Sequence, residues 1–510
     1  MSSRWQPRLL LEARRTVIAV ARASQARVGS PQWTVGGPQW AASRIVALLM
    51  PLVVLSGCMV GPDYHRPPIE PPESFKSQAG SAPAPHIAPE WWRLYRDPDL
   101  DQLVATATSS NQSLAQAAAA VDQARALTRV AASFLAPTIS ADPTFTRQHT
   151  SANRNSTITG QPAGTGATFN DWLVPIDLTY ELDVWGRVRR GLESSRAQAV
   201  ASADDEAMVR LMVQTDVAQL YYTLRLLDAE AEILAQTVAA YREQVRVLSV
   251  QFNTGLISEI VVSQAEAQLQ STLAQQRDIA RARADEEHAL AILCGQPAPS
   301  FSVAAKPLRE VSPPEVPAGL PAMLLARRPD VAAAEQSVVA ANAQIGVAMA
   351  AFYPQFSLAS AFGFESANLR NLADWRSRVA SIIPGVSLPI FTRGRLKATV
   401  DATRAQYRQT VATYLNQVLV AYGDVEDALT DLHSYTGIVG DLRKAVTASE
   451  NYLRLAQVQY RTGLVDYLTV IDAERTLLAN RLSLAQNLNL QLGASIRLIK
   501  ALGGGWEDRH

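Results

Sequence analysis

Two stretches of the chain, residues 187–251 and 395–459, almost lack helix-breaking residues. Their only glycines are Gly191 in the first and Gly423, Gly437 and Gly440 in the second, and neither contains a proline. At 1.5 Å per residue, a helix of about 65 residues is a rod roughly 100 Å long. A rod of that length does not fit inside a compact domain, so the sequence predicts an elongated molecule.

The two rods belong to an internal duplication. Residues 250–256 (VQFNTGL) return 208 positions later as residues 458–464 (VQYRTGL), and Gly295 returns as Gly503. A period this long is too large for a solenoid and indicates a duplicated domain. We expect a first repeat at 96–300 (helix, two strands, long helical hairpin), a linker at 301–326, a second repeat at 327–503 and a tail at 504–510. The shorter helices are expected at 114–133, 259–293 and 465–501.

Alternating apolar residues predict strands in each half. From Trp172 to Val184 every second residue is apolar, with Asp177, Thr179, Glu181 and Asp183 between them. In the second half Phe356, Leu358, Phe362 and Phe364 share one parity, followed by Ile382, Val386, Leu388 and Ile390 on the return. Period two is the spacing of a strand with two different faces.

Four strands per chain cannot close a barrel, and lipid tolerates no open sheet edge. Two copies would give eight strands, a number that side chains fill, and three would give twelve with an open lumen. The fold class predicted is therefore an α+β membrane protein, a trimer whose twelve-stranded β-barrel continues into a helical barrel. A water-soluble sandwich with the same alternation remains an alternative, as does a coiled-coil stalk for the rods.

The N-terminal region reads as an export signal. Residues 1–57 contain seven Arg, no Lys and one acid, and an apolar run at 45–55 leads to Leu55-Ser56-Gly57-Cys58. Small residues before a cysteine resemble the lipobox of bacterial lipoproteins, with a plain signal anchor as the alternative. The region is long for a signal, which suggests a start assigned too early. Residues 58–95, rich in proline, are expected to form an extended tether.

The composition argues against catalysis and against nucleic acid. The 47 basic and 47 acidic residues balance, and without residues 1–57 the chain has 40 basic and 46 acidic residues. The six histidines are isolated, and no nucleophile or phosphate-loop motif occurs. Cys294, at a predicted helix end, is interpreted as structural. We expect no enzyme, no metal and no cofactor other than N-acyl and diacylglycerol lipid on Cys58.

Seven stretches resemble the TolC-like outer-membrane efflux factors, in their lipidated NodT/OprM-like branch. They are residues 60–64 (VGPDY), 180–190 (YELDVWGRVRR), 328–331 (RPDV), 352–354 (FYP), 388–391 (LPIF), 424–429 (DVEDAL) and 500–506 (KALGGGW). The resemblance covers essentially everything after Cys58. It implies a homotrimer with a twelve-helix periplasmic barrel, anchored in outer-membrane lipid. It also implies a periplasmic adaptor (a membrane fusion protein) and an inner-membrane RND pump as partners. Met59 after the cysteine favours the outer membrane by resemblance to the lipoprotein sorting rule.

The same resemblance assigns two groups of site residues. The adaptor-docking tips match Thr254, Gly255, Leu256, Ile257 and Ser258, and Thr462, Gly463, Leu464, Val465 and Asp466. The pore constriction matches Leu468 and Asp472, with Arg475 as a nearby cation and Tyr460 as a lock residue, although plain packing is as good an interpretation of Tyr460. A basic residue at Val465 and an acid at Thr469, which join the lock in TolC itself, are missing here.

The function implied is an exit duct of a tripartite efflux system, which passively conducts drugs or other small toxic compounds to the exterior. Two alternatives remain open at this point: an exit channel of a type I polypeptide secretion system, and a non-conducting periplasmic stalk. The sequence does not name the substrate.

Overall fold

The computed structural model describes residues 59–77, 87–153, 166–308, 313–314, 316 and 327–506. The chain divides into two units, Met1–Ser56 and Gly57–His510, and every described residue lies in the second. The predicted signal region 1–57, the lipidation site Cys58 and residues 507–510 of the predicted tail lie outside the described residues. So does much of the predicted linker 301–326.

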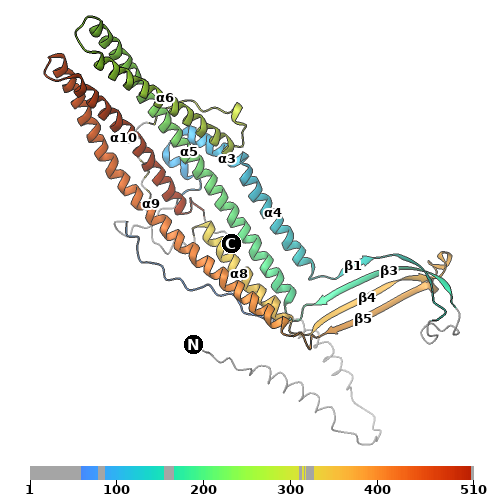
Figure 1. Ribbon diagram of the computed structural model, residues 1–510. Helices are drawn as coiled ribbons and strands as arrows, with labels where there is room; N and C mark the ends of the chain where they lie inside the picture. The colour runs from blue at the N-terminus through green and yellow to red at the C-terminus, as the bar shows by residue number, and fades with distance from the viewer. Residues whose placement is uncertain are drawn as a thin grey trace, which may run out of the picture. The chain divides into compact units, whose positions relative to one another are not determined.

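The two predicted rods are continuous helices of equal length. Helix α5 spans Arg187–Asn253 and α9 spans Arg395–Arg461, with 67 residues each. Each is followed by an antiparallel helix of 35 residues, α6 (Glu259–Leu293) and α10 (Tyr467–Ala501). Helix α10 begins two residues later than predicted because the Asp466 carboxylate caps it by accepting a hydrogen bond from the Thr469 N–H. The duplication therefore holds for complete hairpins (Figure 1).

Shorter helices precede the strands in each half. Helix α4 covers Gln112–Ser133, within two residues of the prediction, and α8 covers Pro329–Ala350. Helix α3 (Pro98–Ser110) and the one-turn helices η1 (Trp91–Tyr95) and η2 (Ala298–Ser300) were not predicted. Asn111 separates α3 from α4, and its side chain caps α4 through the Leu114 N–H at 3.0 Å.

In both halves a returning helix and a short helix meet end to end. The Asn111 side-chain amide donates to the Leu293 carbonyl at the end of α6, at 2.9 Å. Gly295 follows with φ +65°, and a Cβ there would lie 2.2 Å from the last carbonyl oxygen of α3. Gly503 repeats this at the end of α10, with φ +91° and the Arg327 carbonyl oxygen 1.8 Å from a hypothetical Cβ. Only glycine allows both the left-handed backbone and the close approach.

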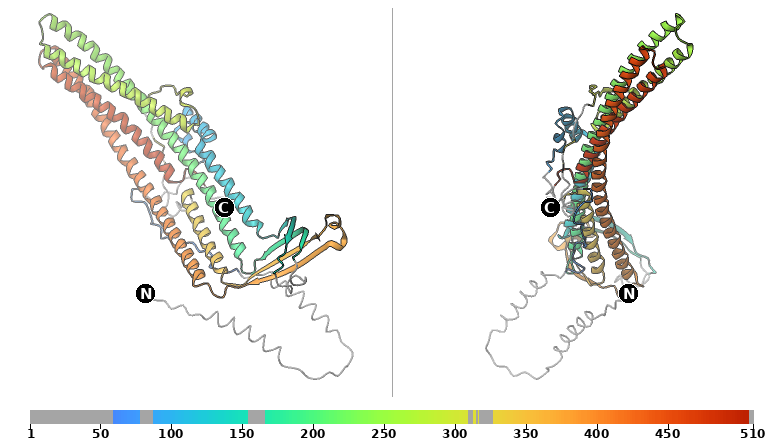
Figure 2. Two further views of the ribbon diagram at one scale, coloured as in Figure 1. Left: turned by 45° about the vertical axis from the view of Figure 1, so that its right-hand side comes forward. Right: turned by 90° about the vertical axis from the view of Figure 1, so that its left-hand side faces the viewer.

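The helices pack side by side around α5. It contacts α4, α6, α8 and α10, while α9 contacts α8 and α10. Figure 2 shows the hairpins lying in one curved layer, with the sheet beginning where α5 and α9 begin. The largest buried cluster lies where the short and returning helices meet and is rich in aromatic rings, among them Trp91, Trp92, Tyr95, Tyr221 and Tyr222.

The sheet contains five strands, β1 (Thr138–Ala141), β2 (Thr144–His149), β3 (Thr168–Leu182), β4 (Gln355–Ser366) and β5 (Arg378–Ser387). β1 and β2 both pair with the same side of β3, and the remaining order is β3-β4-β5, all antiparallel. The first predicted strand is thus interrupted at Asp142-Pro143, because proline lacks the N–H that a ladder needs. The sequence predicted four strands per chain, and the structure has five because the first of them is divided. Two edges stay unpaired within the described chain, the β1–β2 edge and β5.

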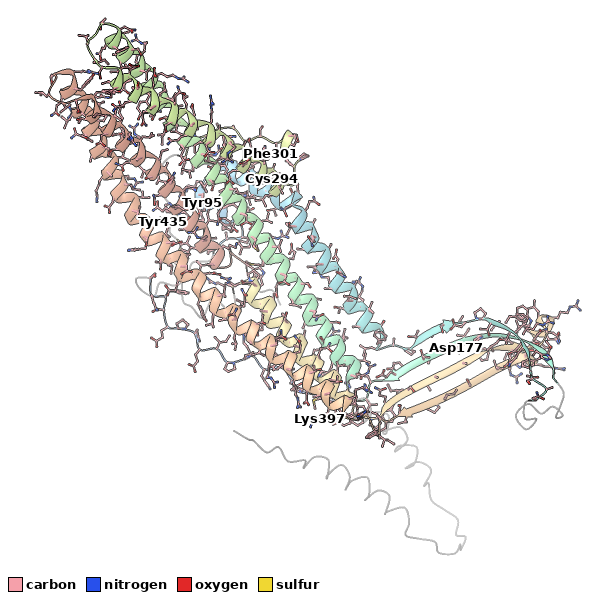
Figure 3. The ribbon with its side chains drawn as sticks, viewed as in Figure 1. Tyr95, Asp177, Cys294, Phe301, Lys397 and Tyr435 are labelled. Carbon is pink, nitrogen blue, oxygen red and sulfur yellow. The ribbon has the colours of Figure 1, made fainter. Side chains whose placement is uncertain are left out.

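The register gives the sheet one apolar face. Trp172, Val174, Ile176, Leu178, Tyr180 and Leu182 lie opposite Ser366, Phe364, Phe362, Ser360, Leu358 and Phe356. Residues directly opposite each other share a face, so the two predicted apolar sets fall on the same side. Asp177 (labelled in Figure 3) and Glu181 lie on the other face. The apolar face is exposed in the single chain, with Ile382 76% and Ile176 54% accessible.

The strands end earlier than predicted at the junction with the helices. β3 stops at Leu182, because the Asp183 carboxylate accepts hydrogen bonds from the Val188 and Arg189 N–H groups, at 3.0 and 2.9 Å, and so caps α5. β5 stops at Ser387, so the predicted strand residues Leu388 and Ile390 lie beyond it. Across the junction Trp185 stacks on Tyr353, with ring centroids 4.7 Å apart.

Candidate functional site

The two helical tips have the same backbone geometry. The Gly255 N–H donates to the Phe252 carbonyl at 2.8 Å, and the Leu256 N–H donates to the Gln251 carbonyl at 2.9 Å. In the second hairpin the equivalent bonds of Gly463 and Leu464 measure 3.0 and 2.9 Å. This pair of bonds, with a glycine at positive φ, is the Schellman ending of a helix.

Each tip presents an apolar residue to solvent. Leu256 is 75% exposed and Leu464 is 76% exposed, and Ile260 on the first turn of α6 is 67% exposed. Ile257 and Val465 are half-buried beside them. The two repeats thus expose the same residue at the same place on their tips.

Near its start, α10 carries the residues predicted to form the constriction. Leu468 is 52% exposed, and Asp472 and Arg475 are exposed as well. The Asp472 carboxylate accepts a hydrogen bond from the Tyr452 hydroxyl of α9 at 3.1 Å. Arg475 forms no ion pair with it in the part of the chain that the structure describes. The partner of Asp472 in a single subunit is therefore a tyrosine that the sequence did not identify.

Tyr460 lies below this turn, among packed side chains. Its ring centroid is 5.5 Å from that of Tyr467, and both belong to a cluster that joins the two hairpins near the tips. The buried members of that cluster are Leu248, Ala265, Ala456, Tyr467, Val470 and Ala473. In the single chain Tyr460 thus makes packing contacts. This agrees with the second of the two interpretations of Tyr460, plain packing rather than a role in a lock.

Glu474 is a residue that the sequence did not single out. It lies two positions from Asp472, on the side of α10 that faces α5, where a cavity of about 150 Å³ also has Tyr241, Leu477 and Arg481 in its lining. Burial raises the pKa of its carboxyl to about 7, against the effect of a hydrogen bond with Gln244.

Its equivalent in the first repeat, Glu266, is exposed. In the sequence, the only sign of interest was that both repeats have a glutamate at this position. That identity does not indicate which of the two glutamates is buried.

The segment that follows Cys58 is extended, but it is bound rather than free. The Val60 N–H donates to the Trp185 carbonyl at 3.0 Å, and the buried Asn342 amide donates to the Pro62 carbonyl at 2.9 Å. The Arg190 guanidinium, whose side chain is 3% exposed, pairs with Asp63 at 2.7 Å.

Three glycines make room for this segment. A Cβ on Gly61 would lie 2.5 Å from the Gly346 Cα, and one on Gly186 would lie 2.8 Å from the Met59 side chain. Residue 59 is therefore held where β3 passes into α5. The segment predicted as a tether begins as a fixed attachment.

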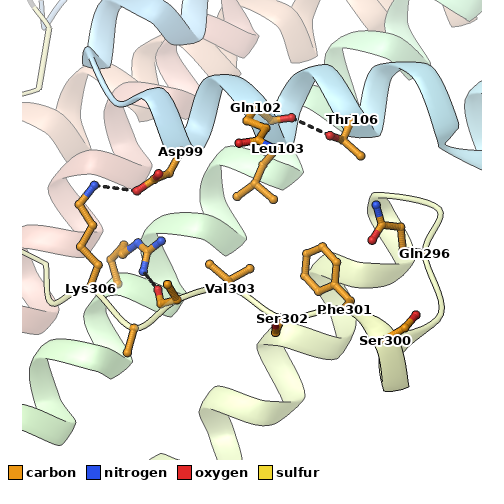
Figure 4. A pocket seen from close by; sticks show the side chains of 13 residues that line it. Asp99, Gln102, Leu103, Thr106, Gln296, Ser300, Phe301, Ser302, Val303 and Lys306 are labelled. Carbon is orange, nitrogen blue, oxygen red and sulfur yellow. Dashed lines mark hydrogen bonds and ion pairs between the residues drawn. The ribbon is translucent and has the colours of Figure 1, made fainter.

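An open groove lies between α3 and residues 300–306 (Figure 4). An ion pair and a hydrogen bond fasten its walls: Lys306 Nζ lies 2.7 Å from the Asp99 carboxylate, and the Arg225 guanidinium donates to the Ala304 carbonyl at 2.7 Å. Nearby, Cys294 ends α6 (Figure 3), and burial raises the pKa of its thiol to about 11. An unreactive thiol agrees with the structural interpretation of this residue.

Within the described ranges, no cluster of three or more His, Cys, Asp or Glu side chains is arranged to hold a metal ion. Among the same residues, no helix combines the length and the apolar character needed to span a membrane.

Comparison with known proteins gives concordant matches. The family described as "Outer membrane efflux protein" matches residues 103–296 and 320–504. The toluene efflux pump outer membrane protein TtgF of Pseudomonas putida is 32% identical over 470 residues, covering 89% of this chain and 96% of its own. The cation efflux system protein CusC of Escherichia coli is 30% identical over 472 residues, covering 90% and 99%. Among solved structures, the outer-membrane channel OprN superposes with a TM-score of 0.81 at 28% identity, covering 88% of this chain and all of its own.

Proposed function

The chain belongs to the outer membrane efflux protein family, and from this premise we propose that three copies form the exit duct of an RND-type tripartite efflux system. It is an outer-membrane channel protein of an efflux system. The proposal adds the number of copies, the class of pump and the cargo, which is drugs or other small toxic compounds. In this proposal the duct is passive, and the pump supplies the energy for export.

The observation that carries the proposal is the two-faced sheet with two open edges at the ends of the long helices. An apolar face toward lipid requires every backbone group to be paired, so the β1–β2 edge of one copy must meet β5 of the next. β1 and β2 together occupy the place of one strand beside β3, so each copy contributes the equivalent of four strands. Three copies then give a barrel of twelve strands, which leaves an open lumen. The same contacts would cover exposed apolar residues of α4 and α9, among them Leu127, Val130, Leu419 and Leu455, and also Phe134, which follows α4.

We propose that Cys58 carries the lipid. The attachment of residues 59–63 at the start of α5 supports this, because it fixes the chain one residue away from Cys58 at the junction of sheet and helices. Acyl chains attached there would enter the membrane beside the sheet. Each buried CH₂ contributes ~0.8 kcal/mol to such anchoring.

The proposed gate lies at the opposite end of the molecule. Leu468 and Asp472 of three copies would form two rings near the axis, and three carboxylates at close range repel each other unless a cation or a basic partner is present. Leu256 and Leu464 at the tips would contact the helical hairpins of a periplasmic adaptor. One relative is named for the efflux of toluene and another for the efflux of cations. Because related ducts serve such different cargoes, we propose that the pump, rather than this chain, selects the cargo.

Reconstitution into planar bilayers tests the proposal. We expect trimers that conduct ions, and we expect Asp472→Ala to raise the leak of the closed channel, because the carboxylate ring and its bond to Tyr452 are lost. Asp441→Ala is the matched control, since Asp441 is an exposed helix acid paired with Lys444 of the same helix.

If the reconstituted protein is monomeric and does not conduct ions, the proposal of a trimeric channel is contradicted. In cells, loss of the gene should increase sensitivity to at least one toxic compound. Unchanged sensitivity together with a block in polypeptide export would favour the type I secretion alternative.

A further inference from the structure

The apolar face of the sheet carries charge at one end only. In the five described strands, Arg147 of β2 lies opposite Asn170, and Arg378 of β5 lies opposite Phe364, which places both arginines on the face of Trp172 and Ile176. The carboxylates of these strands are Asp171, Asp177, Glu181 and Glu365, and the register places all four on the other face. The apolar face therefore has two permanent cations and no acid.

Both arginines lie at the end of the sheet that is remote from the helices. Phe145 and Trp172 lie at the same level, with ring centroids 4.3 Å apart. Arg378 extends toward the β4–β5 loop, where its guanidinium lies 4.8 Å from the Trp375 ring centroid and donates to the Trp375 carbonyl at 2.8 Å. Aromatic rings next to long cationic side chains are typical of the boundary between hydrocarbon and headgroups.

The β4–β5 loop continues this surface. It contains the one-turn helices η3 (Leu369–Asn371) and η4 (Trp375–Ser377), and it exposes Leu369 at 60% and Trp375 at 64%. Arg370 and Arg376 are also exposed.

The loop is internally bonded. The Ser377 hydroxyl donates to the Asn371 carbonyl at 2.7 Å, and the Asp374 carboxylate accepts from the Arg376 N–H at 3.2 Å. The acid of the loop, Asp374, is thus engaged with the backbone.

We propose that this outer rim, Arg147 and Arg378 with Trp375 beside them, binds the phosphate groups of an anionic glycolipid in the outer leaflet. A guanidinium group matches a phosphate with two parallel hydrogen bonds, and exposed aromatic rings fit the boundary of the acyl chains. In the described strands, no acid shares this face with the two arginines.

The inference rests on the proposed function in one respect. Arg147 and Arg378 belong to opposite edges of one sheet, and closure of the barrel brings Arg378 of one copy next to the edge that carries Arg147 of the next copy. Each glycolipid site would then lie at a boundary between copies, and one trimer would have three of them.

Lipid binding to the full-length protein tests the inference. The protein is placed in phosphatidylcholine nanodiscs, and lipopolysaccharide is titrated while bound lipid is counted by native mass spectrometry. We expect Arg147→Gln/Arg378→Gln to weaken binding about thirtyfold, since each cation near an anionic surface contributes about fivefold and the two factors multiply. Enzymatically dephosphorylated lipopolysaccharide should bind the unaltered protein just as weakly.

The matched control is Arg246→Gln/Arg281→Gln, which removes two exposed helix arginines that pair with acids of their own helices. It should leave the affinity unchanged. The inference is overturned if the double variant of Arg147 and Arg378 binds lipopolysaccharide as tightly as the unaltered protein does. It is also overturned if dephosphorylated lipopolysaccharide binds as tightly as the intact lipid. Equal displacement by millimolar inorganic phosphate would indicate a free-phosphate site instead and overturns it too.

Conductance of the same protein variants, reconstituted into planar bilayers, separates the two proposals. If the protein conducts but its affinity for lipopolysaccharide does not depend on the outer rim, only the glycolipid site is refuted. If the protein neither assembles nor conducts, the duct is refuted.

Discussion

Replacing Glu474 with glutamine should stabilise the protein at pH 8 and change its stability little at pH 5. The carboxyl lies between α10 and α5, with Tyr241 and Gln244 of α5 and Tyr467 of α10 as its neighbours. Arg475 and Arg481 lie on its own helix, and no ion pair joins either to Glu474 among the described residues. Glutamine keeps the shape and can still bond to Gln244, but it cannot ionise.

The sign follows from the two pKa values. The carboxyl titrates near 4.5 when unperturbed and at about 7 in the folded protein. Between these values the folded state holds more protons than the unfolded state, so stability falls as the pH rises through this window. A shift from 4.5 to about 7 corresponds to about 3 kcal/mol per subunit once the pH exceeds 7.

The expected change in melting temperature is small but measurable. At ~2.1 cal/mol/K per residue, the roughly 450 residues of the unit Gly57–His510 have an unfolding entropy of ~0.9 kcal/mol/K. A difference of about 3 kcal/mol then shifts Tm by ~3 °C. Scanning fluorimetry of detergent-solubilised protein from pH 5 to pH 9 at one scan rate should show the two curves separating between pH 5 and 8.

Glu266→Gln is the control, because Glu266 holds the equivalent position in the first repeat and is exposed. It should melt in parallel with the unaltered protein at every pH. If Glu474→Gln keeps the same pH dependence as the unaltered protein, or if Glu266→Gln produces the same separation, burial of Glu474 is not the cause and the reasoning fails.

Two pairs of glycine substitutions test the backbone arguments. Gly363→Ala should disrupt pairing of β4 with β3 at a cost on the order of 3 kcal/mol, because its Cβ would lie 2.2 Å from the Val174 carbonyl oxygen, whereas Gly385→Ala meets only a rotatable serine hydroxyl at 2.6 Å. The yield of heat-modifiable oligomers on gels measures this, and equal yields would contradict it. Gly463→Ala should cost roughly 1 kcal/mol for its positive φ, while Gly437→Ala, inside α9 with open space around it, should gain roughly 1 kcal/mol. Shifts of Tm in the same direction for both would refute the distinction.

The sequence predicted the elements well, because the signals for them are local. Absence of breakers gave the rods to within two residues, and period two gave the apolar face of β3 and β4. The sequence prediction was wrong at the ends of strands, where a single residue ends the strand. Asp183 continues the alternation in sequence but caps α5 in the structure, and Pro143 divides the first strand.

For the candidate site, sequence and resemblance named Leu468 and Asp472 but could not supply the contacts around them. The Tyr452 hydroxyl that reaches Asp472 lies 20 residues earlier, on another helix. The assigned roles of these residues remain predictions for the conductance experiment.

What the sequence by itself determined is the set of helices and strands, their order, their duplication and the two faces of the sheet. Each follows from the chemistry of neighbouring residues along the chain. Only the tertiary structure decided which copy of a repeated feature is covered. Glu266 and Glu474 are equivalent in sequence and both α6 and α10 lie against α5, yet Glu266 is exposed whereas Glu474 lines a space between α10, α5 and α9. Arg147 and Arg378 share a face only through the register of four strands. Burial and register depend on contacts between residues far apart in the chain, which no local pattern encodes.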